Sequence, residues 1–93
     1  MLKINFIDMG IRIGEQTHGK NIAYGQAVDK VPQIMEILWP GGIPVEHYQD
    51  AELITRVLEK FIRLAAGNRK AFSESPWVDA AGYCLIGAMR EEE

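Results

Sequence analysis

The chain has 93 residues, of which 47% are hydrophobic and 25% are charged, and its net charge is −3 at neutral pH. This length fits one domain, and no apolar run approaches the roughly 20 residues that a membrane-spanning helix requires. The acidic balance argues against binding to extended nucleic acid, because that affinity comes mainly from Lys and Arg on phosphates. Cys84 is the single cysteine, and no signal-peptide pattern opens the sequence. We therefore expect a cytoplasmic protein without disulfides.

The N-terminal segment shows two patterns. Residues 2–13 alternate apolar and polar side chains around Asp8-Met9-Gly10, which predicts a short β-hairpin. Such a hairpin is marginal alone, so it would pack on the helices or pair with a second copy. Residues 14–27 are rich in glycine and polar side chains and predict an ordered loop, in which Lys20 is most simply a solvated residue.

The first helix is expected to begin at Asp29, a candidate N-cap residue. Pro32 would then lie in the first turn, where its missing N–H is harmless. An earlier start would place Pro32 in the helix interior. The helix should end near Trp39, because a proline follows it directly.

Two longer helices should follow. The second is predicted over about 48–66, with Gly67 at the usual C-terminal glycine position. The third is predicted over 76–89, because Ser75 is a good N-cap and the proline after it suits the first helical position. The fold class is therefore all-α, with three main helices and a possible N-terminal hairpin. We divide the single domain, residues 1–93, into a hairpin and loop (1–20), a helical core (21–89) and a tail (90–93).

The third helix contains signs of close packing and of incomplete burial. Gly82 and Gly87 each cost roughly 1 kcal/mol relative to alanine in a helix interior, so another backbone is expected to cross nearby. Cys84, Leu85 and Met89 exceed what two short neighbouring helices can cover. The sequence therefore predicts a homo-oligomer, a dimer or higher.

A row of basic residues borders the apolar stripe of the second helix. Arg56, Lys60 and Arg63 are spaced i, i+4, i+7. They fit a solvated rim that forms weak pairs such as Glu52–Arg56 and Glu59–Arg63. They also fit an anion-binding edge, because three cations over two turns can hold a phosphate. Both interpretations remain open on the sequence.

Asp79 is the acid that most needs an explanation. It lies in an apolar stretch, where an ionised carboxylate is costly unless another group pairs with it. Helical spacing places Asp79 and Tyr83 on one face, toward the space that the second helix borders. We therefore expect a contact from Asp79 to Lys60 or Arg63.

Four motifs together suggest a family. They are, in order, Tyr24-Gly25, a helix ending in Leu38-Trp39, Lys60-Phe61-Ile62-Arg63-Leu64, and Ser75-Pro76-Trp77-Val78-Asp79-Ala80-Ala81-Gly82-Tyr83. This series resembles a group of small phage and prophage proteins of unknown function. The resemblance covers about residues 21–89, and its most specific part is the Trp-Val-Asp stretch. That group is in turn similar to the MazG-type all-α nucleotide pyrophosphohydrolases, whose carboxylates on two helices hold magnesium against a nucleoside triphosphate. The resemblance implies a MazG-like helical bundle, with Asp79 as the acid of the later helix.

The chain departs from the enzyme pattern at the carboxylates. MazG-type chemistry uses acids spaced i, i+3 on two helices, because that spacing aims two hard oxygen ligands at one magnesium ion. Here Glu52 and Glu59 are seven apart, and Pro76 stands three positions before Asp79. A magnesium-dependent pyrophosphohydrolase would have to combine Asp79 with Asp50, Glu52 or Glu59, and this activity is an alternative.

The favoured interpretation is a binding module for a nucleotide or another phosphorylated small ligand, which needs no cofactor. Cations would hold the phosphates, aromatic rings would stack on a base, and Asp79 would lie in the same cleft. The expected ligand-binding residues are Tyr24, Arg56, Lys60, Arg63, Trp77, Asp79 and Tyr83. A third possibility is a structural module or one that binds a host protein.

Overall fold

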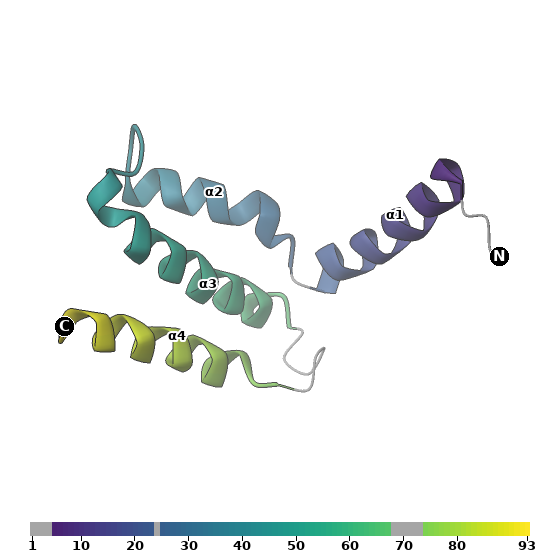
Figure 1. Cartoon of the computed structure of the whole chain (residues 1–93). Helices are drawn as coiled ribbons and strands as arrows, with labels where there is room; N and C mark the ends of the chain where they lie inside the picture. The colour runs from purple at the N-terminus through teal and green to yellow at the C-terminus, as the bar shows by residue number, and fades with distance from the viewer. Residues whose placement is uncertain (1–4, 24, 68–73) are drawn as a thin grey trace.

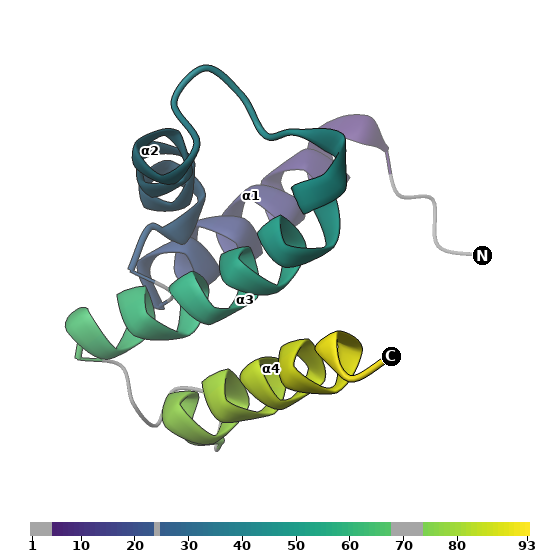
Figure 2. The ribbon, with the colours of Figure 1, turned by 90° about the vertical axis from the view of Figure 1, so that its left-hand side faces the viewer.

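The computed structural model describes residues 5–23, 25–67 and 74–93. Its elements are α1 (Phe6–Ala23), α2 (Ala27–Leu38), the short 3-10 turn η1 (Val45–His47), α3 (Tyr48–Ala65) and α4 (Pro76–Glu91). The middle helix, α3, packs against α2 on one side and α4 on the other, and α1 extends away from this group (Figure 1; Figure 2). The described residues contain no strand, so the all-α class is confirmed. None of their helices is long and apolar enough to cross a membrane.

The predicted N-terminal hairpin is wrong, because residues 6–13 belong to α1. The Asn5 side chain accepts a hydrogen bond from the Asp8 N–H at 2.8 Å and so caps the first turn of a helix. A helix also satisfies its own backbone hydrogen bonds, whereas a lone hairpin leaves two unpaired edges. The predicted loop over 14–27 is wrong as well, since α1 continues to Ala23.

α1 is the least supported element of the fold. It buries no residue, and its three glycines, Gly10, Gly14 and Gly19, weaken the helix. An added Cβ at any of these glycines would meet no atom of the described chain within 4 Å. Close packing against another element therefore does not offset the lower helix stability that the glycines cause.

We therefore predict that the amides of α1 exchange with deuterium faster than those of the other helices. Local opening needs the least free energy where few apolar contacts must be broken. Hydrogen exchange followed by mass spectrometry measures this, with the half of α3 around the buried Ile62 as the protected internal reference. Equal protection of α1 and α3 would contradict the exposed position of α1.

α2 begins at Ala27, two residues before the predicted start at Asp29. Gly25 and Gln26 both have left-handed backbone conformations, with φ values of 72° and 60°. The Gln26 carbonyl then accepts hydrogen bonds from the N–H groups of Asp29 and Lys30. These bonds form the first turn of the helix, which therefore begins at Ala27. Pro32 consequently lies inside the helix. Pro32 has no N–H to donate to the carbonyl of Val28 four residues earlier. Val28 is exposed, so water can bind that carbonyl instead.

The predicted boundaries of α3 and α4 are confirmed to within one or two residues. Gly67 follows the end of α3 with a φ of 83°, and its N–H donates to the Leu64 carbonyl at 3.1 Å. At the start of α4, the Ser75 hydroxyl accepts the Val78 N–H at 3.5 Å, and Pro76 occupies the first helical position.

The close backbone crossing expected at α4 is not found within the described chain. A Cβ at Gly87 would lie 3.5 Å from the Leu53 Cδ1, which is an ordinary side-chain contact. A Cβ at Gly82 would meet no described atom within 4 Å. Gly82 therefore has no packing role among these helices.

The hydrophobic core is small. It contains Ala27, Val31 and Ile62, with Ile34, Met35 and Leu58 packed against them. The chain exposes 7404 Å², about 2,000 Å² more than a compact monomer of this mass. Its radius of gyration is 16.8 Å, against about 12 Å for a compact chain of this length. The helices therefore leave much apolar surface uncovered.

Candidate functional site

A groove of about 680 Å³ lies where α1, α2, α3 and the beginning of α4 meet. This volume is in the range of small-molecule sites, about 300–1,000 Å³. α2 provides its apolar side, and α1 provides polar side chains. The apolar side consists of Ala27, Val28, Val31 and Pro32, and the α1 residues are Thr17, Lys20 and Asn21.

The rest of the groove is strongly charged. Its lining includes four cations, Lys20, Arg56, Lys60 and Arg63, and three acids, Glu59, Glu74 and Asp79. The lining therefore carries one net positive charge, while the whole chain carries a net charge of −3. Such a local excess of cations can attract an anion to a chain that is acidic overall.

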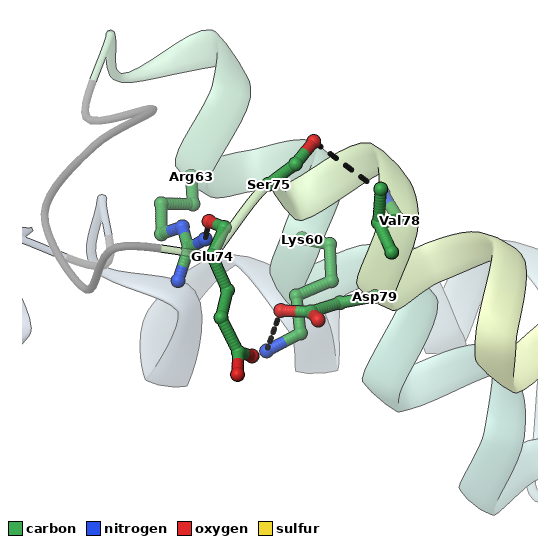
Figure 3. Close-up of polar contacts among 6 residues, drawn as sticks. All are labelled: Lys60, Arg63, Glu74, Ser75, Val78 and Asp79. Atoms are coloured by element: carbon green, nitrogen blue, oxygen red, sulfur yellow. Dashed lines mark hydrogen bonds and ion pairs between the residues drawn. The ribbon is translucent and has the colours of Figure 1, made fainter.

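Lys60 and Asp79 form the ion pair expected from the sequence. The Lys60 Nζ lies 3.8 Å from the Asp79 Oδ2, and both side chains are mostly buried (Figure 3). Asp79 is placed there because the Ser75 cap fixes the first turn of α4 beside α3. The separation exceeds hydrogen-bond length, so this is an ion pair without a direct hydrogen bond.

Replacing Asp79 with alanine should destabilise the fold only slightly, by about 1 kcal/mol or less, because both partners keep some contact with water. Chemical denaturation of the variant measures this, and Asp79→Asn separates loss of charge from loss of volume. A loss of more than about 3 kcal/mol would instead indicate a fully buried pair.

Arg63 has a role that neither sequence interpretation included. Its side chain is only 3% exposed, and its Nη2 donates to the Glu74 carbonyl oxygen at 3.0 Å (Figure 3). This hydrogen bond joins the end of α3 to the segment that leads into α4. Arg63 is therefore a buried anchor that also borders the groove, rather than part of a solvated rim.

Lys20 and Arg56 are the groove cations that remain available to a ligand. Both have exposed side chains, and neither forms an ion pair within the described residues. The sequence interpretation placed Lys20 in a solvated loop and so missed it as a site residue. The sequence feature that could have identified Lys20 is its helical spacing from Thr17 and Asn21, which places the three side chains on one face. This spacing is informative only if the segment is known to be a helix.

The aromatic residues expected at the site lie elsewhere or cannot be placed. Trp77 packs against Phe61, with ring centroids 5.7 Å apart, and it does not line the groove. Tyr83 does not line the groove either. Tyr24 lies outside the described residues. Of the expected ligand-binding set, the groove brings together Arg56, Lys60, Arg63 and Asp79.

The four acids considered for magnesium are separated. Glu59 and Asp79 line the groove, whereas Asp50 lies at the start of α3, 3.9 Å from the Nδ1 of His47. Glu52 is exposed and does not line the groove. Across residues 5–23, 25–67 and 74–93, no group of three or more His, Cys, Asp or Glu side chains is arranged to hold a metal ion.

Comparison of the chain with protein-family models, curated proteins and solved structures gives no match. The resemblance to small phage proteins and to MazG-type pyrophosphohydrolases therefore stays a prediction. The charges and shape of the groove are therefore the basis for a functional proposal.

Proposed function

We propose that the groove binds a phosphorylated small molecule in the cytoplasm, with nucleotides as the leading ligand class. The observation that supports this most is the position of Lys20 and Arg56. These two cations come from α1 and α3, line the same groove, and have no acidic partner within the described chain.

Arg56 and Lys20 would bind a phosphate group in different ways. The planar guanidinium of Arg56 can donate two parallel hydrogen bonds to phosphate oxygens, whereas the Lys20 ammonium acts as a mobile point charge. Lys60 is already paired with Asp79, and Arg63 already holds the Glu74 carbonyl. These two residues therefore position α4 against α3 and keep the groove in shape.

The remaining lining suits the rest of a nucleotide. The apolar side formed by α2 can cover a sugar or a base, as most ligand pockets combine apolar contact with a few polar groups. The Glu59 carboxylate can accept hydrogen bonds from sugar hydroxyls or from a base amino group. Trp77 and Tyr83 lie outside the groove, so a bound base would contact Val28, Val31 and Pro32 instead.

Calorimetric titration with a panel of ligands tests the proposal. The panel contains nucleoside mono- and triphosphates, cyclic dinucleotides and inorganic phosphate, and thermal shift provides a first screen. We expect saturable binding of at least one nucleotide, weakened tenfold or more in Arg56→Gln. Arg90→Gln, at the exposed far end of α4, is the matched control and should bind like the parent. A folded protein that binds no member of the panel would refute the proposal.

Hydrolysis of the bound nucleotide is the second candidate function. Glu59 and Asp79 line the same groove as Lys20 and Arg56, the two cations proposed to bind phosphate. Magnesium in nucleotide sites is commonly held by one or two carboxylates together with substrate phosphates, so two acids are compatible with it. Assays with each nucleoside triphosphate and magnesium test this activity. Turnover that is unchanged in Asp79→Asn would exclude this site as its source.

A further inference from the structure

We propose that nucleotide binding in the groove is coupled to the stability of α1. The bound nucleotide stabilises this helix, and a more stable α1 binds the nucleotide more tightly. This inference rests on the proposed function, because it concerns the same ligand in the same groove. α1 provides the groove residues Thr17, Lys20 and Asn21. The helix with the least support in the fold is therefore part of the site.

α1 has little to hold it in place without a ligand. None of its residues is buried, and α3 packs against α2 and α4 while α1 extends away from them (Figure 1). Helices in proteins owe most of their stability to packing of this kind. The 18 residues of α1 also include Gly10, Gly14 and Gly19, which lower its intrinsic stability. The free chain therefore populates states in which much of α1 is unfolded.

The C-terminal end of α1 is attached to the rest of the fold. The Gln26 N–H donates to the Asn21 carbonyl at 2.9 Å, and the Gly25 N–H donates to the Ile22 carbonyl at 3.0 Å. Gly25 itself lies against α3, since a Cβ there would come within 3.2 Å of the Ile62 Cγ2. The groove residues of α1 lie in the two turns next to this attached end, whereas the preceding turns have no such support.

Lys20 supplies the net charge of the groove. Without it, the three cations that α3 contributes are balanced by the three acids of the lining. The groove therefore attracts an anion more strongly when α1 is in place. A phosphate bound between Lys20 and Arg56 also adds charge-assisted hydrogen bonds that link α1 to α3.

Thermodynamic linkage connects binding to the stability of α1. A ligand that binds better when α1 is helical shifts the population toward that state. Conversely, the apparent affinity falls in proportion to the fraction of molecules whose α1 is unfolded. Substitutions that stabilise α1 away from the groove should therefore tighten binding without any contact with the nucleotide.

Calorimetric titration of a helix-stabilising variant tests this coupling. The probe is the nucleotide of the panel that binds the parent most tightly. Gly10→Ala combined with Gly14→Ala changes two positions that do not line the groove and where a Cβ would meet no described atom within 4 Å. Each alanine can raise the equilibrium constant for helix formation about fivefold, so the double variant should bind about threefold tighter or more. Gly82→Ala makes the same change at an equally open position of α4 and should bind like the parent.

Hydrogen exchange with and without the same nucleotide provides an independent measurement. Residues 10–16 do not line the groove, so slower exchange of their amides reports formation of the helix rather than shielding by the ligand. Saturating nucleotide should slow this exchange about fivefold or more in the parent. The effect should be much smaller in Lys20→Gln, which keeps Arg56 but loses the cation on α1.

The outcomes distinguish this inference from the proposed function. Suppose that the parent binds a nucleotide but exchange over residues 10–16 does not change, or that the double alanine variant binds no tighter than the parent. Either result would overturn the coupling and leave the binding site intact. A parent chain that binds no nucleotide would overturn both proposals.

Discussion

Gly25→Ala should destabilise the protein by about 3 kcal/mol. Gly25 has a φ of 72°, a conformation that costs a residue with a Cβ about 1–2 kcal/mol. The added Cβ would also lie 2.9 Å from the Ala66 Cβ and 3.0 Å from the Ile62 carbonyl oxygen. Overpacking against backbone typically adds about 1–3 kcal/mol. Urea denaturation followed by circular dichroism measures the change in the free energy of unfolding.

Gly41→Ala is the matched control for this prediction. Gly41 has a φ of 86°, similar to that of Gly25, but no described atom lies within 4 Å of its Cβ position. Its replacement should cost only the conformational term, about 1 kcal/mol. The difference between the two variants isolates the close approach of the turn before α2 to the end of α3. Equal losses would contradict that contact.

Arg63→Ala should also cost about 3 kcal/mol. The side chain is 3% exposed, so its removal eliminates the packing of its long apolar stem. The substitution also leaves the Glu74 carbonyl without the hydrogen bond that Arg63 donates. Because Glu74 is exposed, water can replace part of this hydrogen bond, and most of the loss should come from the buried stem of Arg63. The same denaturation measurement applies.

Two substitutions serve as controls for Arg63. Arg63→Lys keeps the charge and most of the stem but lacks the guanidinium fork, so its loss should be intermediate. Arg56→Ala removes an exposed arginine from the same helix and should leave stability unchanged within error. An Arg63→Ala variant as stable as Arg56→Ala would show that Arg63 does not anchor the segment before α4.

Local sequence signals predicted the parts of the fold that depend on neighbouring residues. Ser75 and Pro76 fixed the start of α4, and Gly67 marked the end of α3, because caps act over a few residues. The contact of Asp79 with the basic row of α3 was also predictable, since Asp79 is the acid in the first turn of α4, but the sequence left Lys60 and Arg63 open as its partner.

The remaining features depend on contacts between distant segments. The apolar residues before position 14 fit alternation as well as helical spacing, and the Asn5 cap decides between them. With α1 taken as a hairpin and loop, Lys20 could not be assigned to a site. The burial of Arg63 depends on the path of residue 74, which no periodicity within α3 reveals.

The central claim is that a phosphorylated ligand binds in the groove between α1, α2 and α3. Titration with a nucleoside triphosphate, followed by the methyl signals of the protein in nuclear magnetic resonance spectra, tests it most directly. We predict saturable shifts for the groove methyls of Thr17, Val28, Val31 and Thr55, and none for Leu85 and Met89, which belong to α4 and do not line the groove. Shifts confined to α4, or no shift at millimolar nucleotide, would contradict the claim.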